Sequence, residues 1–273
     1  WPEGGGVMQP YYQDEHVTLY HGDCLEEMRL MDDGCIDLTV TSPPYDNMRT
    51  YKVSLDWGEH IWKPVLGELF RITKQGGVVV WVVGDATIKG SETGTSFRQA
   101  LFAKECGFSL ETMIWEKTGS GCLGSNYFYG QNFEFVFLFV KGKPMHGELI
   151  KDRENKVKSG SVKVNGGLGK DGKGKTRVIE RKPFGKRTSI WRFNPQKNSD
   201  HPAPFPEQLA HDHIISWSNE GDTVFDPFMG SGTTGKMAKQ LGRNFIGTEN
   251  VREYYEIAEK RISSVLDGQK AEG

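Results

Sequence analysis

Short apolar runs alternate along this chain with segments whose apolar residues recur at helical spacing, and this alternation constrains the fold most. Residues Val78–Val83 are wholly apolar, as expected for a strand that is covered on both faces. Before them, apolar residues repeat at helical spacing from Ile61 to Phe70, and Gly76-Gly77 is expected to end that helix. Strands that alternate with helices predict an α/β domain with a doubly wound, mostly parallel sheet.

The same pattern places further elements on both sides of this pair. Strands are expected at 16–20, 36–40, 112–117, 133–140, 223–225 and 244–247, and helices at 25–31, 97–106, 209–217, 236–241 and 254–266. Ligands of such sheets bind outside the carboxyl ends of the strands. A proline-rich loop at Ser42 and a glycine-rich loop at Gly230 follow strands in this way, so both are candidate binding loops. Tryptophans are expected in the core rather than in a site: Trp57, Trp62, Trp81, Trp115 and Trp191.

Basic residues are concentrated in one part of the chain, although the net charge of the whole chain is only −2. Residues 141–188 contain 15 Lys and Arg against 5 Asp and Glu, whereas the remainder has 19 basic and 31 acidic residues. Within this part, 158–177 is rich in glycine and lacks apolar periodicity, which predicts a mobile loop. The loop is either a solvated surface segment or an arm that meets phosphates. The chain thus divides into 8–140, a basic insert at 141–200, and 201–267, with the outer two segments forming one domain.

The cysteines and the apolar runs indicate an intracellular, cytoplasmic protein. Cys24, Cys35, Cys106 and Cys122 form no C-x-x-C pair and have no histidine at zinc spacing, so no metal is expected. The apolar run at 78–83 is too short to span a bilayer, so no membrane partner is expected. The first seven residues lack the basic and apolar segments of a secretory signal, so none is expected.

The loop after Phe225 admits two interpretations. Gly230–Lys236 matches the first seven positions of a phosphate-binding G-x-x-x-x-G-K loop, which would make the chain a nucleotide-binding ATPase. The eighth position should be Ser or Thr but is Met237, which disfavours that class. Alternatively, Asp226 precedes the turn and Glu249 ends the next strand, where an acid holds the ribose hydroxyls of nucleoside cofactors. A carboxylate on the loop itself suits an ammonium or sulfonium ligand, which indicates S-adenosylmethionine.

The segment Ser42-Pro43-Pro44-Tyr45 ends a strand that is expected to be fully buried. The two prolines fix the local φ angles and remove two N–H donors, so the nearby carbonyls point outward in fixed directions. Tyr45 adds an aromatic face beside them. Carbonyl acceptors and a ring for stacking together form a site for a flat amine.

These two segments resemble the motifs of the amino-group DNA methyltransferases, which modify N4 of cytosine or N6 of adenine. Their order, with Pro-Pro-Tyr first, a basic region next and the cofactor loop last, resembles the β arrangement of that family. The run at 215–235 is also similar to methyltransferases carried by prophages. The resemblance covers roughly Val17–Leu266. It implies a Rossmann-like, seven-stranded S-adenosylmethionine-dependent methyltransferase sheet, mostly parallel with the family's antiparallel strand, and target recognition by the insert.

The resemblance also implies roles for individual residues. The catalytic motif is matched by Ser42, Pro43, Pro44 and Tyr45. Cofactor contacts are expected from Asp23, Cys24, His201, Phe205, Pro206, Asp226, Pro227, Phe228, Gly230, Ser231, Gly232, Thr233, Thr234, Glu249 and Asn250. Contacts with double-stranded DNA are expected from Lys156, Lys158, Lys170, Lys173, Lys175, Arg177, Arg187 and Arg192. A homodimer and a companion restriction enzyme are compatible with the resemblance, and the sequence leaves both open.

The expected reaction is direct methyl transfer to an exocyclic amine. Ser42 and the Pro43 carbonyl would accept the two N–H groups of the amine, and Tyr45 would stack on a base extruded from the helix. The resemblance links Ser at the first motif position with N4-cytosine enzymes and Asp with N6-adenine enzymes, so cytosine is favoured and adenine is the alternative. Methyltransferases of RNA or protein glutamine normally carry Asn there, and a catalytically inactive DNA-binding protein would not keep both motifs.

Overall fold

The computed structural model describes residues 9–44, 57–119, 124, 127–145, 147–156, 160–168, 174–180, 182–195 and 205–265. The strands are β1 (Tyr12–Gln13), β2 (Val17–His21), β3 (Ile36–Thr41), β4 (Thr73–Val83), β5 (Thr87–Ile88), β6 (Ser91–Glu92), β7 (Ser109–Lys117), β8 (Phe133–Val140), β9 (Arg153–Glu154), β10 (Ser161–Leu168), β11 (Gly174–Glu180), β12 (Phe184–Gly185), β13 (Ile190–Phe193), β14 (Thr223–Asp226) and β15 (Asn244–Glu249). The helices are α1 (Cys24–Leu30), α2 (Glu59–Ile72), α3 (Thr95–Cys106), α4 (Glu207–Trp217), α5 (Thr233–Gln240) and α6 (Arg252–Ser263).

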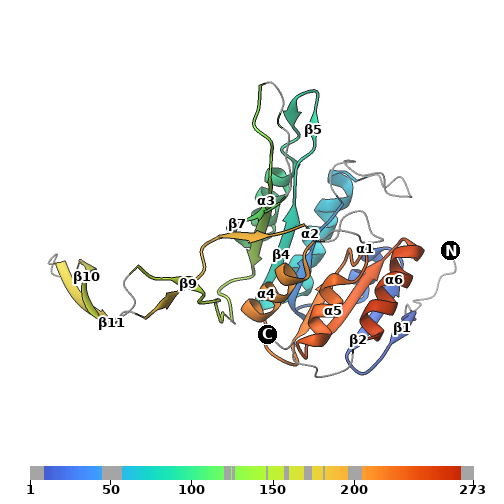
Figure 1. The fold of residues 1–273 in the computed structure, drawn as a ribbon. Helices are drawn as coiled ribbons and strands as arrows, with labels where there is room; N and C mark the ends of the chain where they lie inside the picture. Colours follow the sequence, from blue (N-terminus) through green and yellow to red (C-terminus); the bar gives the residue numbers. More distant parts are fainter. Residues whose placement is uncertain are drawn as a thin grey trace. The chain divides into compact units, whose positions relative to one another are not determined.

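A central sheet organises the larger of two units, which comprises residues 1–148 and 190–273 (Figure 1). Among the described residues this sheet has nine strands in the order β1-β2-β15-β14-β3-β4-β8-β7-β13. Strands β2, β15, β14, β3 and β4 are mutually parallel, and β8 runs antiparallel between β4 and β7. The predicted mostly parallel sheet with one internal antiparallel strand is therefore confirmed. The predicted number of seven strands is too low, because β1 and β13 extend the two edges.

The chain leaves two neighbouring strands of this sheet in opposite directions. From β3 it continues through α2 to β4, whereas from β14 it continues through α5 to β15, on the other side. The boundary between β3 and β14 is thus the point where the strand order reverses. Open α/β sheets bind their ligands at the carboxyl edge of that point.

Helices cover the sheet in two layers. Helices α1, α2 and α3 pack against one another, and α4, α5 and α6 form the second group (Figure 1). The tryptophans expected in the core are all buried: Trp57, Trp62, Trp81, Trp115 and Trp191. No helix among the described residues combines the length and apolar character needed to cross a bilayer.

Helix α2 ends earlier than its sequence suggests. It stops at Ile72, and Gly76-Gly77, expected to end it, lie inside β4 instead. A Cβ at Gly77 would come within 2.9 Å of the Asp37 carbonyl oxygen of β3, so glycine is needed there for close strand pairing. The pairing of β3 with β4 is irregular beside this point, between Ile36 and Leu38, which accommodates the extra residues.

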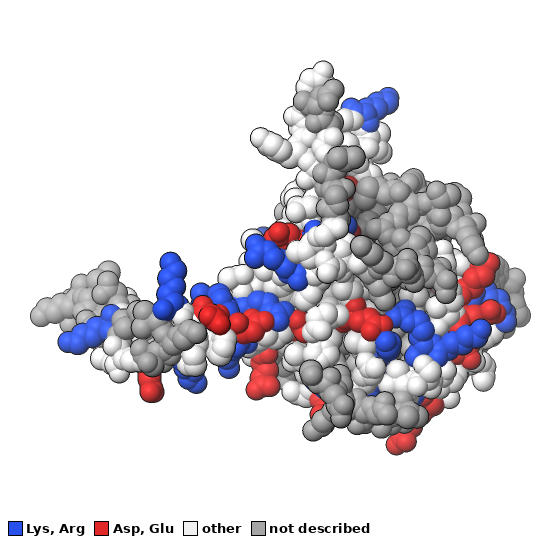
Figure 2. Space-filling model, viewed as in Figure 1, with Lys and Arg blue, Asp and Glu red and all other residues white. Residues whose placement is uncertain are grey.

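Residues Leu149–Ser189 form the second, smaller unit. The predicted loop at 158–177 is wrong for most of its length, because β10 and β11 pair as an antiparallel hairpin. The sequence does alternate over a few residues at each end, as in Ser161-Val-Lys-Val164, but glycines interrupt the pattern. The strands β9 and β12, which precede and follow that hairpin in the chain, pair antiparallel and complete the described strands of this unit. Lys and Arg side chains are spread along it, interspersed with several Asp and Glu (Figure 2).

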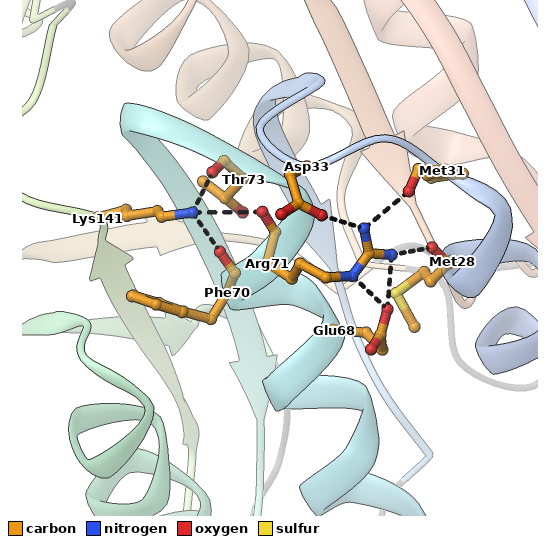
Figure 3. A network of polar contacts seen from close by, with 8 residues as sticks. All are labelled: Met28, Met31, Asp33, Glu68, Phe70, Arg71, Thr73 and Lys141. Atoms are coloured by element: carbon orange, nitrogen blue, oxygen red, sulfur yellow. Dashed lines mark hydrogen bonds and ion pairs between the residues drawn. The ribbon is translucent and has the colours of Figure 1, made fainter.

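Hydrogen bonds and ion pairs hold α1 and α2 together near the amino ends of the parallel strands (Figure 3). The Arg71 guanidinium donates to the Met31 carbonyl at 2.8 Å and pairs with Asp33 and Glu68, each at 2.7 Å. The Lys141 ammonium donates to the carbonyl oxygens of Phe70, Arg71 and Thr73 at the end of α2. Lys141 therefore caps a helix in the larger unit, although the charge pattern assigns it to the basic insert.

Candidate active site

Two direct hydrogen bonds join the ends of β3 and β14. The Thr41 hydroxyl, on the last residue of β3, donates to Asp226 Oδ1 at 2.7 Å. The Thr234 hydroxyl on α5 donates to the Val40 carbonyl oxygen at 3.0 Å. All four residues are buried. The proline-rich segment after Thr41 and the glycine-rich loop after Asp226 are therefore brought together at the strand-order reversal.

Ser42, Pro43 and Pro44 directly follow β3 at its carboxyl end. Pro43 is buried, and Ser42 and Pro44 are half-buried. The prolines cannot donate to a neighbouring strand, so the sheet pairing ends here. The fourth residue of the predicted motif, Tyr45, lies outside the described residues.

The carboxyl of Asp226 lies in an apolar environment and is only 1% exposed. Burial raises its pKa to about 7, because charging it inside the protein loses hydration. Hydrogen bonds from the Thr41 hydroxyl and the Phe228 N–H oppose this shift, and the nearby Glu249 carboxylate adds to it. The side chain can therefore change charge near neutral pH.

The loop from 227 to 232 leads into the first turn of α5. Gly230 and Gly232 have φ angles of +53° and +79°, which favour glycine. At Gly232 there is a second reason, because a Cβ would come within 2.9 Å of Ala258 Cβ on α6. Gly232 therefore also permits the close packing of this turn against α6. The Thr233 hydroxyl on this turn is buried and has no hydrogen-bond partner among the described residues.

Charged side chains from α4, α5 and α6 form a network of ion pairs and hydrogen bonds that stabilises the glycine-rich loop. Arg261 of α6 donates to the carbonyl and hydroxyl oxygens of Ser231, at 2.7 and 2.9 Å. The same guanidinium pairs with Glu207 of α4 at 2.8 Å, and Lys236 of α5 pairs with Glu207 at 2.8 Å. Lys236 is the lysine of the alternative phosphate-loop interpretation, and here it neutralises a carboxylate. Sequence reasoning missed Arg261, because nothing in its local sequence indicates a contact 30 residues away.

Two of the acids expected to contact the cofactor, Glu249 and Asp23, lie at the carboxyl ends of the neighbouring strands β15 and β2. Glu249 ends β15 next to His21 of β2, and its carboxylate accepts the N–H groups of Gly230 and Val251, each at 2.8 Å. Its burial raises its pKa. Asp23 is exposed and caps α1 by accepting the Leu25 N–H at 2.7 Å.

The other predicted cofactor residues lie around the same edge or outside the described part. Asn250 is exposed directly after β15, and the Cys24 thiol begins α1, where burial raises its pKa. Phe205 and Pro206 are buried at the start of α4. Phe228 packs edge-on against Trp57, with ring centroids 5.5 Å apart. Pro227 lies in the glycine-rich loop itself, and His201 lies outside the described residues.

Only some of the predicted DNA contacts can be placed. Lys156 is exposed, whereas Arg187 pairs with Asp152 within the smaller unit and Arg192 pairs with Glu116 across β13 and β7. Lys175 and Arg177 belong to β11. The remaining predicted contacts lie outside the described residues: Lys158, Lys170 and Lys173.

Comparison with known families agrees with this arrangement of motifs. A model of the N6/N4 methyltransferase family, described as DNA methylase, matches residues 36–260. The chain belongs to this family. The match includes both candidate loops and the segment between them.

Individual relatives share most of the chain. It is 51% identical over 247 residues to the orphan methyltransferase M.BamHII of Bacillus amyloliquefaciens, covering 86% of this chain and 91% of that protein. It is 31% identical to the type II methyltransferase M.ScaI of Streptomyces caespitosus, covering 94% of this chain and 84% of that protein.

Solved structures share the fold. The PvuII DNA methyltransferase (cytosine-N4-specific) superposes with a TM-score of 0.67 at 22% identity, covering 95% of this chain and 90% of that one. The complex of M1.HpyAVI with SAM superposes with a TM-score of 0.60 at 25% identity, covering 90% and 99%.

Proposed function

We propose that this DNA methyltransferase of the N4/N6 class modifies the exocyclic N4 amine of cytosine at a specific site in double-stranded DNA. The observation that carries the proposal is the position of Ser42, Pro43 and Pro44 at the end of β3. Thr41 and Asp226 join this segment to the glycine-rich loop through a 2.7 Å hydrogen bond. A target amine held by the first loop would therefore lie close to a methyl donor held by the second.

The methyl donor is S-adenosylmethionine, and the residues at the carboxyl edge fit it. The buried Thr233 hydroxyl, without a partner among the described residues, offers a hydrogen bond to a ligand at the glycine-rich loop. Asp226 and Glu249 place two buried carboxyl groups on that side, and a cationic ligand beside them would favour their charged forms. When bound, this cofactor supplies an electrophilic methyl group on a sulfonium sulfur.

The residues of the first loop act on the amine. An exocyclic amine of a base is a weak nucleophile, because its lone pair is delocalised into the ring. Ser42 and the Pro43 carbonyl accept its two N–H groups and turn the lone pair toward the donor. The N–C bond forms as the S–C bond breaks, and the surplus amine proton passes to solvent. Positioning and fixed dipoles supply the catalysis.

Cytosine is favoured over adenine by the serine at the first position of the motif. The resemblance to amino-methyltransferases associates Ser42 with N4-cytosine chemistry, whereas the adenine enzymes commonly carry Asp there. A methylated N6 of adenine is the alternative product, since the family includes both activities. The fold, the cofactor and the roles of the other residues are the same in either case.

The expected binding partners are inferred from the charge distribution and from the names of the relatives. The basic unit at 149–189 would meet the phosphates of DNA, since its sequence is rich in Lys and Arg and the lysines whose exposure is described all face solvent: Lys151, Lys156, Lys163, Lys182 and Lys186. One relative is named an orphan methyltransferase and another a type II methyltransferase. We therefore propose a role in restriction and modification, with or without a companion nuclease. A homodimer is the candidate oligomeric state besides the monomer.

The product of the reaction tests the proposal. The protein is incubated with unmethylated genomic DNA and S-adenosylmethionine, the DNA is digested to nucleosides, and the methylated base is identified by mass spectrometry. N4-methylcytosine is the expected product, and mapping the modified positions gives the recognition sequence. N6-methyladenine would overturn the choice of base alone, whereas cofactor binding without any methylated base would overturn DNA as the substrate.

A further inference from the structure

The loop between β7 and β8 carries three consecutive aromatic side chains that face solvent. Tyr127, Phe128 and Tyr129 are 89%, 67% and 103% exposed. Exposed aromatic groups in a row lose the free energy that burial would give, so they commonly mark a surface that binds something. The high exposure of all three rings shows that they are not part of the hydrophobic core.

This loop leaves the sheet at the same edge as the candidate active site. Strand β4 runs parallel to β3, and its last residue, Val83, pairs with Phe135 near the start of β8. The segment before β8 therefore emerges at the carboxyl edge, beside the end of β4. Since β8 is two strands from β3, its start lies about 10 Å from the Ser42 loop along this edge.

The base of the loop is held in place. The Lys117 N–H donates to the Asn132 carbonyl at 2.7 Å, and the Thr118 hydroxyl donates to Asn194 Oδ1 at 2.8 Å. Near the tip, Gly124 lies against the backbone of Phe128–Gly130 so closely that no Cβ would fit. The aromatic rings are therefore carried by a loop whose base is held by hydrogen bonds, an arrangement that can place side chains on a partner.

A second projection rises from the same edge (Figure 1). Hairpin β5–β6 follows β4, and its turn has positive φ at both Lys89 (+51°) and Gly90 (+79°), which is typical of a tight hairpin. All six residues from Thr87 to Glu92 are exposed, including Ile88 at 58%. The hairpin also exposes the charged residues Lys89 and Glu92, and a blue side chain extends from the otherwise mostly white described part of the upper projection in Figure 2.

We infer that Tyr129, with its two aromatic neighbours, stacks on the bases of duplex DNA beside the target and stabilises the duplex from which the target base has been extruded. This inference rests on the proposed function. Taking a base out of the stack exposes the faces of its neighbours, and an aromatic ring can replace the lost stacking. Flat rings at the active-site edge fit this partner, and a second copy of the chain is the competing occupant that the test addresses.

The test compares two DNA duplexes that carry the recognition sequence, one fully paired and one with the target base mispaired. Tyr129→Ala should lower kcat/KM on the paired duplex about tenfold, as expected when one aromatic ring no longer stacks on a base. The decrease on the mispaired duplex should be much smaller, because extrusion is already easy there. Tyr129→Phe should behave as the wild type. Leu30→Ala, which removes a side chain 57% exposed at the opposite edge, is the control.

Fluorescence of 2-aminopurine at the target position gives a readout without turnover. The wild type should raise the fluorescence of the bound duplex, and Tyr129→Ala should raise it less at saturating protein. Equal activity of Tyr129→Ala and wild type on both duplexes, equal decreases on both, or an altered oligomeric state of the variant would each overturn the inference. Failure of the wild type to methylate the paired duplex would instead overturn the proposed function.

Discussion

At the scale of single residues, the ionisation of the buried Asp226 carboxyl makes the stability of the folded protein depend on pH. Its pKa rises from 3.8 to about 7 on folding, so between these values the folded state binds more protons than the unfolded state. The free energy of unfolding should therefore fall as the pH rises through this range. Asp226→Asn keeps the shape and an acceptor oxygen but cannot ionise. Its stability relative to the cofactor-free wild type should increase between pH 5 and pH 8 by about 3 kcal/mol.

Denaturant unfolding of both proteins at several pH values measures this difference. The comparison with Asp226→Asn is needed because burial also raises the pKa of Glu249, which contributes in the same direction. Stability curves that run parallel for the two proteins would show that Asp226 keeps an ordinary pKa in the folded state.

The serine of the catalytic motif gives a second prediction at this scale. Ser42→Ala removes one acceptor for the target amine and leaves the backbone carbonyls in place. The kcat for methyl transfer should fall roughly 10- to 100-fold, while the Kd for S-adenosylmethionine stays the same. Steady-state kinetics and calorimetric titration separate these effects, with Ser263→Ala on α6 as the control. A weakened Kd with unchanged kcat would place Ser42 in the cofactor site instead.

At the scale of elements, the sequence predicts a strand best where both of its faces are apolar. The bounds of β8 are those expected, and the apolar second half of β4, Val78–Val83, is the predicted strand, although β4 begins five residues earlier at Thr73. The hairpin β10–β11 was missed because glycines interrupt its alternation, and β13 was missed because four residues carry too little periodicity. The end of α2 was misplaced, since Gly76-Gly77 resemble a helix terminus but serve a close strand contact.

The candidate site, too, could be predicted from the sequence only in part. Its two loops could be predicted, because prolines and glycines constrain the local backbone. The bracing of the glycine-rich loop by Arg261 could not, since it joins helices that are distant in sequence. Interactions of that kind arise only from the packing of α4, α5 and α6 against one another.

This bracing leads to a prediction about the helix group. Arg261→Ala removes both hydrogen bonds to Ser231 and the ion pair with Glu207, and it leaves the ion pair between Glu207 and Lys236 in place. The loop should lose its fixed conformation, so the Kd for S-adenosylmethionine should rise about tenfold, which corresponds to about 1.4 kcal/mol of binding free energy. Arg252→Ala on the same helix, where the ion pair with Glu256 is exposed, is the matched control. Unchanged binding by calorimetry would show that the loop is held without Arg261.

The cap of α2 gives a prediction about stability alone. Lys141→Met keeps the aliphatic stem but removes three donors from the carbonyl oxygens of Phe70, Arg71 and Thr73. The free energy of unfolding should fall by about 1–3 kcal/mol, with DNA affinity unchanged at temperatures where the protein is folded. Lys143→Met, an exposed neighbour, is the control and should change neither. If Lys141→Met instead reduced DNA affinity and left the stability unchanged, Lys141 would belong to the DNA-binding surface.

At the scale of the whole molecule, charge is divided between the two units. The larger unit carries the candidate active site, and the smaller unit at 149–189 falls within the basic part of the sequence. Such a division separates chemistry from electrostatic attraction to phosphates. The concentration of basic residues can be read from the sequence because composition needs no knowledge of packing, whereas the strands of the smaller unit cannot.

The salt dependence of DNA binding tests this division. Replacing four exposed lysines of the smaller unit by glutamine, Lys156, Lys163, Lys182 and Lys186, should weaken DNA binding at low salt. The slope of log K against log salt concentration should decrease by up to about 0.9 for each phosphate that the protein no longer neutralises, because fewer counterions are released. Cofactor affinity should stay the same, since the acids and glycines at the ends of β14 and β15 are untouched. The control replaces Lys104 and Lys260, near the ends of α3 and α6 in the larger unit. An equal change of slope in the control would show that attraction to DNA is a property of the whole surface and not of the smaller unit.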